Sequence, residues 1–381
     1  MIRAAEMDCA VSFFGRTILD EQTGAVFMNW SGSGFEVVFE ATRLDVEFLA
    51  LETVYPTEGA LWPCVSVFLD EQETPALELL LDQPSQRCTL FRNETLQKHR
   101  IRVVKRTEND KGKVGLFGIE VEGTLLPMEP SGRNTRLEFI GDSITCGFGN
   151  EAKTREGVFR SGEQNGLKSY SAVAARLLNA DYHNISISGI SLCTPLDPDF
   201  SLEVPGAAGL RVTIKAMEDY YAYTDRLHEE ACGKANCFSK WDFSRFRPDA
   251  IIINLGTNDS YRIKAATDKF AEVAHFERRY AAFIRKIREL NGSAPVICCT
   301  LGPMDYYLYD NIVEAVRKYK QETSDARVFC YKFGGIYPIE EGFGAGDHPS
   351  VKTHRRMGLE MSAQLKPWLR DADGEGNREQ A

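Results

Sequence analysis

Residues 137–145 read LEFIGDSIT, an apolar run that ends in the small and polar residues GDS at 141–143. Four more apolar runs of strand length follow, separated by helical stretches: 182–187, 250–254, 296–300 and 328–331. Apolar strands that alternate with helices are typical of a parallel sheet buried on both faces. The chain therefore predicts a five-stranded, flavodoxin-like doubly wound sheet, whose ligands bind at the carboxyl ends of its strands.

Two helices of this domain can be located from their patterns. Apolar residues recur at helical spacing from 276 to 290 and end at Asn291-Gly292, a plausible C-cap. A final helix is predicted over 349–369. The stretch 191–247 exceeds the usual length of a loop, and we expect it to contain a helix around 212–226.

The first third of the chain has a different pattern. Apolar and polar residues alternate there, as at 35–39, 44–48 and 65–69, with turn residues between the runs. This pattern predicts short antiparallel strands and an all-β, jelly-roll-like sandwich domain over 1–130. The breaker cluster at 127–132 is the expected junction, followed by an α/β domain over 131–370 and a flexible polar tail over 371–381.

Composition narrows the class of protein. The chain has 381 residues and a net charge of −10, so a nucleic-acid partner is not expected. No run approaches the roughly 18 apolar residues that span a bilayer, and no membrane partner is expected. Ten cysteines are too dilute for a disulfide scaffold, and acids interrupt the N-terminal residues, which do not resemble a signal peptide. We therefore expect a cytoplasmic protein; its oligomeric state stays open.

Four polar or small residues follow predicted strands or precede the last helix. Ser143 follows the first strand, where it is either a nucleophile or a helix N-cap. Gly189 follows the second strand and is either a backbone N–H donor or a turn glycine. Asn258 follows the third strand and is either an amide donor to an oxyanion or part of an Asx turn. His348 precedes the last helix and is either a general base or a surface residue.

Taken together, these residues favour chemistry. In the predicted sheet all four would meet at one edge, and a nucleophile, a base and two oxyanion donors are the groups that acyl transfer requires. No metal site is predicted, because Cys232 and Cys237 have no second ligand pair at a suitable spacing.

Four ordered blocks carry a resemblance to a known family: Gly141-Asp142-Ser143, Gly189, Gly256-Thr257-Asn258-Asp259 and His348-Pro349-Ser350. They resemble the blocks of the SGNH (GDSL-type) hydrolases. The segments FGRT at 14–17, WSGSG at 30–34, VKRTE at 104–108 and KWDF at 240–243 resemble carbohydrate esterase family two, which has an N-terminal β-sandwich. The resemblance covers roughly residues 10–370.

This resemblance implies an O-deacetylase that acts on acetylated sugars and needs no cofactor. Ser143 would be the nucleophile and His348 the base, and the oxyanion hole would be formed by Ser143 N–H, Gly189 N–H and Asn258 Nδ2. Tyr261 is a candidate for stacking on sugar rings, and Met304 is expected to point toward the site. Tyr220, Tyr221 and Tyr223 are read as a packed aromatic cluster, with stacking on sugars as the alternative.

One position departs from the family pattern. The family places an aspartate three or two residues before the histidine, where this chain has Ala345 and Gly346. Asp347 adjoins His348, and neighbouring side chains in an extended segment point to opposite faces, so we expect a backbone carbonyl to hold the imidazole. Two other functions stay open: a serine esterase, lipase or thioesterase of different acyl specificity, and a carbohydrate-binding protein with a weak catalytic site.

Overall fold

The computed structural model describes residues 2–4, 10–55, 58–128, 132–197, 200–203, 209 and 211–375. The chain divides into two structural units. The first consists of the described parts of Met1–Gly132 with Val158–Leu167 and Tyr223–Ser239, and the second of Arg133–Gly157, Lys168–Ala222 and the described part of Lys240–Ala381.

The predicted α/β domain of 131–370 was therefore too inclusive, because two of its segments belong to the first unit. Asp225, in the second of these segments, accepts hydrogen bonds from the side-chain amides of Asn29 (2.7 Å) and Asn109 (2.9 Å). Arg106 Nε donates to the carbonyl of Gln164, in the first segment, at 3.3 Å. Such long-range polar contacts produce no periodic pattern in the sequence, so the sequence did not predict them.

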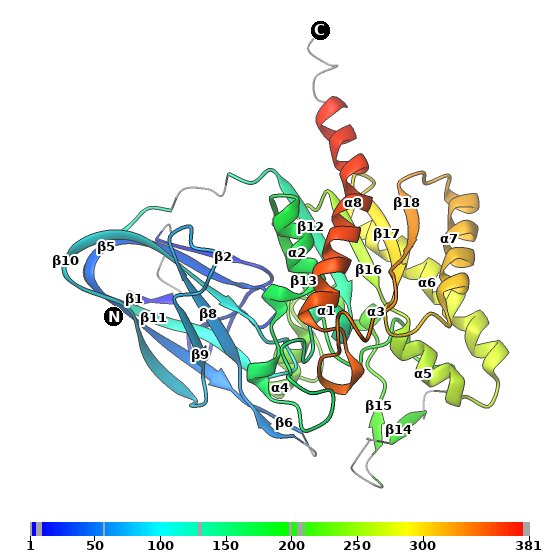
Figure 1. Ribbon diagram of the computed structural model, residues 1–381, viewed down its shortest axis with the longest axis horizontal. Helices are drawn as coiled ribbons and strands as arrows, with labels where there is room; N and C mark the ends of the chain where they lie inside the picture. Colours follow the sequence, from blue (N-terminus) through cyan, green and yellow to red (C-terminus); the bar gives the residue numbers. More distant parts are fainter. Residues whose placement is uncertain are drawn as a thin grey trace. The chain divides into compact units, whose positions relative to one another are not determined.

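The first unit is an antiparallel β domain, as predicted. Nine strands form one sheet: β1 (Ile2–Arg3), β2 (Val11–Phe14), β3 (Ile18–Leu19), β4 (Val26–Phe27), β5 (Gly34–Leu51), β8 (Cys64–Leu69), β9 (Leu77–Leu80), β10 (Ser85–Lys105) and β11 (Lys113–Leu126). The strands β6 (Thr53–Tyr55) and β7 (Gly59–Leu61) pair separately, and α4 spans Arg226–Ala231. Figure 1 shows β5 and β10 as long curved ribbons. Phe35, Val37 and Phe39 of β5 are fully buried, which confirms the period-two pattern.

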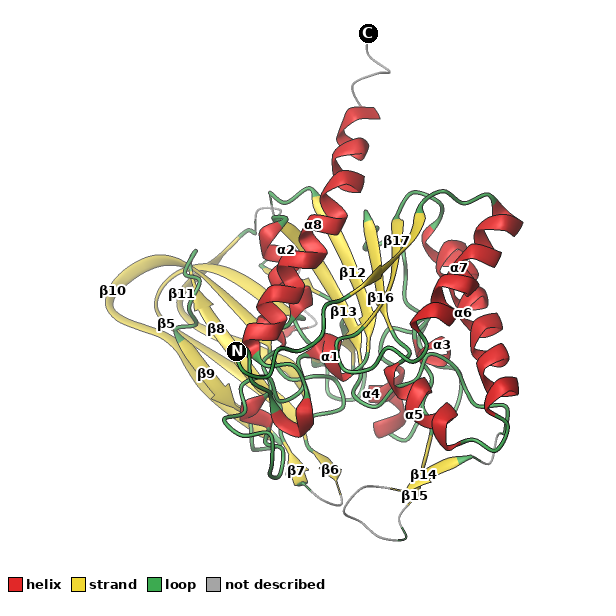
Figure 2. Cartoon of the chain, turned by 45° about the vertical axis from the view of Figure 1, so that its right-hand side comes forward, coloured by secondary structure: helices red, strands yellow, loops and turns green. Residues whose placement is uncertain are grey.

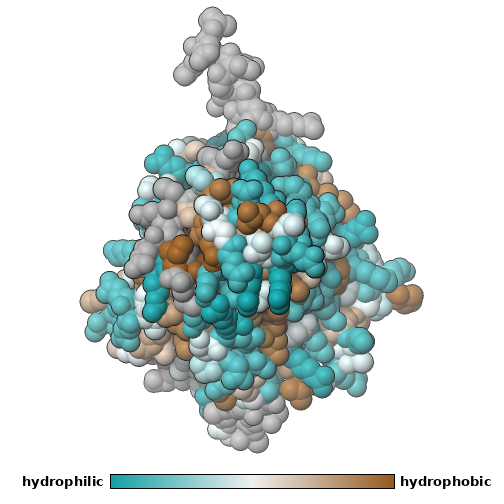
Figure 3. Space-filling view, turned by 90° about the vertical axis from the view of Figure 1, so that its left-hand side faces the viewer, coloured by the Kyte–Doolittle hydropathy of each residue, from teal (hydrophilic) through white to brown (hydrophobic). Residues whose placement is uncertain are grey.

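The face of the molecule shown in Figure 3 is mainly hydrophilic, with small separate hydrophobic patches. No described helix has the length and apolar character that crossing a membrane would require.

The second unit contains the predicted parallel sheet. Its strands are β12 (Thr135–Gly141), β13 (Ala180–Ser186), β16 (Ala250–Asn254), β17 (Val296–Leu301) and β18 (Val328–Lys332), in the order β13-β12-β16-β17-β18. All four pairings are parallel. This order confirms the flavodoxin-like doubly wound sheet.

Helices cover both faces of this sheet (Figure 2). The helices α2 (Tyr170–Leu177) and α8 (Val351–Glu375) pack on one face, and α6 (Lys269–Asn291) and α7 (Tyr309–Thr323) on the other. The helix α6 ends at Asn291 and is capped by Gly292, which has φ +78°, as the C-cap pattern predicted. Two short helices begin after strands, α1 (Ser143–Cys146) after β12 and α5 (Thr257–Ala265) after β16; 3₁₀ turns span Ser161–Glu163, Gly166–Lys168 and Ala345–Asp347.

Two sequence predictions about this part of the chain were wrong. The helix expected around 212–226 is absent: β14 (Ser201–Glu203) pairs with β15 (Arg211–Thr213), and α3 covers only Met217–Tyr220, because Ala216 is extended. The tail predicted over 371–381 begins later, because α8 continues to Glu375. Residues 376–381 lie outside the described part of the chain.

Candidate active site

Ser143 lies at the junction of β12 and α1. Asp142 is the N-cap of α1, and its Oδ1 accepts the Ile144 N–H at 3.0 Å. Gly141 allows this tight turn, since a Cβ there would lie 2.0 Å from Thr145 Oγ1. Ser143 is 8% exposed, so the turn presents its hydroxyl at the carboxyl end of the sheet while covering most of the residue.

His348 contacts the Ser143 hydroxyl directly. Its Nε2 lies 2.9 Å from Ser143 Oγ, although 205 residues separate the two in sequence. The other ring nitrogen, Nδ1, lies 3.0 Å from the Ala345 carbonyl and 3.1 Å from the Gly346 carbonyl. Because carbonyl oxygens only accept hydrogen bonds, Nδ1 carries the proton of the neutral ring and Nε2 is left to accept the proton of the serine.

The surroundings of His348 favour its neutral form. Desolvation by the surrounding protein lowers the pKa of His348 below its usual value, and this effect outweighs the opposing hydrogen bonds to the Ala345 and Gly346 carbonyls. The ring of Phe148 packs against the imidazole with 4.7 Å between centroids. The imidazole is therefore kept as an unprotonated base.

Asp347 does not orient the imidazole. Its carboxylate pairs with Arg155 at 2.5 Å, and its backbone is left-handed, with φ +63°. The segment 149–155 also holds this turn through its backbone, since Gly149 O accepts the Ala345 N–H and Arg155 O accepts the Gly346 N–H, at 3.0 and 2.8 Å. The turn thus presents two carbonyls where the family pattern has a carboxylate.

Gly189 and Asn258 lie at the same sheet edge as Ser143. In the register, Gly141 is opposite Ser186 of β13 and Asn254 of β16, and the two residues follow these strand ends by three and four positions. Asn258 Nδ2 donates to the Ile190 carbonyl at 2.9 Å and lies 3.5 Å from Asp142 Oδ2. The side-chain amide of Asn258 is thus fixed beside the residue that precedes Ser143.

Asp142 is an unusual carboxyl group. It is fully buried, and burial raises its pKa to about 7, with the nearby charge of Asp259 as a smaller contribution. Burial also raises the pKa of Asp259, against hydrogen bonds from backbone N–H groups and the attraction of Arg262. Two buried carboxyl groups therefore adjoin the candidate residues, Asp142 next to Ser143 and Asp259 next to Asn258.

The remaining predicted contacts with substrate are not tested by the geometry. Tyr261 is on α5, three residues after Asn258, and is 61% exposed. Met304 is half-buried and packs against the hydrophobic core that α2 and α8 cover. Tyr220 and Tyr221 are buried, as expected for a packed cluster, and Tyr223 contacts Phe238 edge to face.

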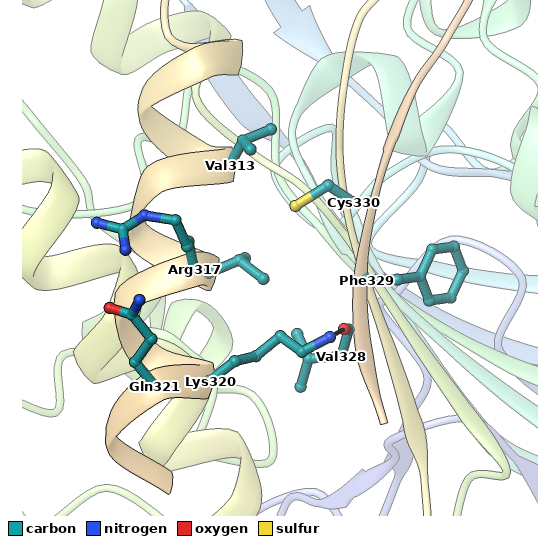
Figure 4. Close-up of a pocket in the computed structure, with 8 residues that line it drawn as sticks. Val313, Arg317, Lys320, Gln321, Val328, Phe329 and Cys330 are labelled. Atoms are coloured by element: carbon teal, nitrogen blue, oxygen red, sulfur yellow. Dashed lines mark hydrogen bonds between the residues drawn. The ribbon is translucent and has the colours of Figure 1, made fainter. Parts of the chain in front are cut away.

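An open groove lies between α7 and β18 (Figure 4). Its walls carry the side chains of Val313, Val316, Arg317, Lys320, Gln321, Val328, Phe329 and Cys330. None of the site residues predicted from the sequence lines this groove. Among the described residues, no group of three or more His, Cys, Asp or Glu side chains is arranged to hold a metal ion.

The sequence did not reveal several residues that shape the site. Arg155 pairs with Asp347. Three buried acids, Glu218, Asp259 and Glu272, bind the loop that follows Gly189. Of these, only Asp259 belonged to a recognised sequence block, Gly256-Thr257-Asn258-Asp259.

Comparison with known proteins decides the family. The model of the GDSL-like lipase/acylhydrolase family matches residues 137–361, which is more than half of the chain. The chain belongs to the GDSL-like lipase/acylhydrolases. A second family model, described as carbohydrate esterase 2 N-terminal, matches residues 13–130 of this GDSL-like protein.

Named relatives of this GDSL-like chain are esterases. It is 29% identical over 347 residues to the cellulase/esterase CelE of Acetivibrio thermocellus. The matched region is 88% of this chain but only 37% of that protein. It is 23% identical over 368 residues to an acetylxylan esterase / glucomannan deacetylase of Cellvibrio japonicus, covering 95% of this chain and 90% of that protein.

A solved structure resembles the GDSL-like chain over nearly its whole length. This is a family two carbohydrate esterase from Clostridium thermocellum in complex with cellohexaose, with a TM-score of 0.76 and 28% identity; the match covers 94% of this chain and 99% of that one. An acetyl xylan esterase from the rumen bacterium Butyrivibrio proteoclasticus shares the fold, with a TM-score of 0.77 at 22% identity.

Proposed function

We propose that this protein is a carbohydrate O-acetyl esterase, which removes acetyl groups from acetylated sugars or oligosaccharides through an acetyl-serine intermediate. The observation that carries the proposal is the 2.9 Å contact between Ser143 Oγ and His348 Nε2, with Nδ1 engaged by two carbonyls. The substrate class is supported by the carbohydrate esterase 2 N-terminal match and by the names of the relatives.

The first half-reaction forms the acyl-enzyme. His348 Nε2 accepts the proton of Ser143 as Oγ attacks the acetyl carbonyl carbon. The negative charge that develops on the carbonyl oxygen would be stabilised by the N–H groups of Ser143 and Gly189 and by Asn258 Nδ2. His348 then gives its proton to the departing sugar oxygen, leaving an acetyl-serine and a free sugar hydroxyl.

The second half-reaction uses water. His348 Nε2 takes a proton from a water molecule, and the resulting hydroxide attacks the acetyl-serine. Collapse of the second tetrahedral intermediate releases acetate and returns the proton to Ser143 Oγ. Nδ1 keeps its proton throughout, because the Ala345 and Gly346 carbonyls accept its hydrogen bond, and only Nε2 exchanges protons.

Tyr261 is the proposed sugar contact. Tyr261 is exposed and follows Asn258 by three residues on the same helix, so the two residues share one face of α5. An exposed aromatic ring offers a flat apolar face on which the apolar face of a sugar ring can pack. Met304, whose side chain packs against the core, belongs to the same proposal.

Release of acetate from a panel of acetylated monosaccharides and oligosaccharides tests the proposal. We expect the wild-type protein to release acetate and Ser143→Ala to release none, with the circular dichroism spectrum unchanged. A series of esters with longer acyl chains tests the acyl group, and we expect acetate to be strongly preferred over butyrate. Full activity in Ser143→Ala would contradict the proposal, and so would a preference for long acyl chains.

A further inference from the structure

The loop 190–196, which follows Gly189, is bound by three buried carboxylates. Asp259 of α5 accepts the N–H of Leu192 at 2.7 Å and that of Cys193 at 3.3 Å. The N–H groups of Thr194 and Leu196 are bound at 3.1 Å each by Glu218 of α3 and Glu272 of α6. Four backbone donors of one loop are thus satisfied by acids from three helices.

Each of these carboxylates also faces an arginine. Asp259 is fully buried, and the fully buried Arg262 lies 3.6 Å from it. The same Arg262 pairs with Glu272, and Arg279 pairs with Glu218. A buried carboxylate is costly unless it is both paired and hydrogen-bonded, and here the backbone N–H groups of the loop provide much of the hydrogen bonding.

Two consecutive residues of α5 hold opposite polar groups of this loop. Asn258 Nδ2 donates to the Ile190 carbonyl at 2.9 Å, and Asp259 accepts the N–H groups two and three residues later. The Ile190 carbonyl immediately follows Gly189. The position of the Gly189 N–H relative to Asn258 Nδ2 is therefore set by contacts with α5, together with the backbone hydrogen bonds of Ser191 to Lys215 and Met217.

We propose that Asp259 is a positioning residue of the oxyanion hole. Its carboxylate holds the loop 190–196 so that the Gly189 N–H and Asn258 Nδ2 converge on the same oxygen. This inference rests on the proposed roles of Gly189 and Asn258. Oxyanion donors act only within a narrow range of distance, so a small displacement of the loop weakens stabilisation of the transition state.

A carboxylate suits this role because each of its two oxygens accepts one N–H. An asparagine has a single side-chain oxygen, and its NH₂ group would face the Leu192 or Cys193 N–H. The variant Asp259→Asn keeps the size of the side chain but loses one of the two hydrogen bonds. It also loses the charge that faces Arg262.

Glu272 provides a matched control. It is buried, pairs with the same Arg262 and binds the same loop, but at Leu196, seven residues after Gly189. Glu272→Gln therefore disturbs the fold in a similar way while leaving the Asp259 contacts with Leu192 and Cys193 in place.

The test measures how fast a p-nitrophenyl phosphonate modifies Ser143 in the full chain. The phosphoryl oxygen of this reagent requires the oxyanion donors, but the reaction needs no sugar. We expect Asp259→Asn to react about tenfold more slowly than wild type and Glu272→Gln within about threefold of it. Equal slowing in both variants, no slowing in Asp259→Asn, or no reaction of the wild-type protein would overturn the proposal.

A second variant covers the case in which Asp259→Asn does not fold. Asp259→Glu keeps the charge opposite Arg262 and displaces the carboxylate by one methylene. We expect it to fold and to react with the phosphonate several-fold more slowly; reaction at the wild-type rate would overturn the proposal.

Steady-state kinetics separate positioning from general disorder of the site. With an acetylated sugar, Asp259→Asn should lower kcat and leave KM and the affinity for the deacetylated sugar unchanged, because the donors act on the transition state. A parallel loss of sugar affinity would indicate a purely structural role. If the wild-type protein reacts with the phosphonate but releases no acetate from any sugar, the proposed substrate class fails, while the ratio of phosphonate rates still decides the role of Asp259.

Discussion

The two sides of the candidate site are held by different forces. On the base side, backbone carbonyls of Ala345 and Gly346 hold His348, and the nearby ion pair of Arg155 and Asp347 is about half exposed. On the oxyanion side, buried carboxylates bind the loop 190–196. The proposed base thus depends on backbone geometry, and the proposed oxyanion donors depend on buried carboxyl groups. Substitutions on the two sides should therefore have different consequences.

The largest effect is expected at His348. His348→Ala removes the base and should lower kcat/KM for an acetyl ester by on the order of 10⁴-fold or more. Acetate release by the purified variant measures the loss, and the melting temperature serves as the control for folding. Retention of more than a few per cent of the activity would mean that another group accepts the serine proton.

Asn258 should come next. Asn258→Ala removes one proposed oxyanion donor, and such losses lower kcat by about 10²–10³-fold. Because an oxyanion donor acts on the transition state, the effect should fall mainly on kcat. The variant also loses the hydrogen bond to the Ile190 carbonyl. A change confined to KM would argue against a role in the transition state.

Alanine substitutions at two glycines test whether the backbone of the turn 345–347 positions His348. A Cβ at Gly149 would lie 2.4 Å from the Ala345 Cβ, whereas a Cβ at Gly346 would meet His348 Nδ1 at an ordinary 3.6 Å. Both residues have positive φ, so both alanine variants carry a similar backbone strain of about 1 kcal/mol.

Only Gly149→Ala should displace the turn that presents the carbonyls. We expect it to lower kcat by about tenfold or more, and Gly346→Ala by less. Initial rates with an acetyl ester compare the two. Equal losses would show that the turn tolerates the clash.

Loss of the ion pair between Arg155 and Asp347 should change kcat only slightly. Exposed ion pairs contribute about 0–1 kcal/mol, so Asp347→Asn should change kcat by less than about fivefold. An aspartate that orients a catalytic histidine costs about 10⁴-fold when it is replaced by asparagine. A loss of that size would show that Asp347, and not the carbonyls, holds the imidazole.

The smallest expected effect is a shift of the pH profile. Only neutral His348 can accept the serine proton, so kcat/KM falls as the pH drops through its pKa. Desolvation lowers that pKa, so the acidic limb should have its midpoint below 6.5. The profile of kcat/KM is measured at subsaturating substrate. A midpoint above 6.5 would contradict the lowering of the His348 pKa by desolvation.

The sequence predicted those features that local patterns encode. Five apolar runs defined the parallel sheet, and the residues that follow them placed Ser143, Gly189 and Asn258 at one edge. The carbonyl contact of His348 could be anticipated because Ala345 and Gly346 cannot supply a carboxylate. The cytoplasmic location stays a prediction, since no structural feature tests it.

Long-range polar contacts could not be read from the sequence. Asp225 belongs to the first unit because of hydrogen bonds to residues more than a hundred positions away. Glu218 and Glu272 bind the loop 190–196 from separate helices, and nothing in their neighbourhoods marks them as buried. The length of the stretch 191–247 suggested a helix around 212–226, but β15 pairs with β14 at its start and only the short α3 forms after it.

Trapping the acyl-enzyme tests most directly whether Ser143 is the nucleophile. The full chain is mixed with an acetylated oligosaccharide, quenched in acid within one turnover, digested and analysed by mass spectrometry. The reaction described above requires an acetyl group on the hydroxyl of residue 143 and on no other side chain. An acetyl group found elsewhere, or turnover that proceeds while residue 143 stays unmodified, would refute it.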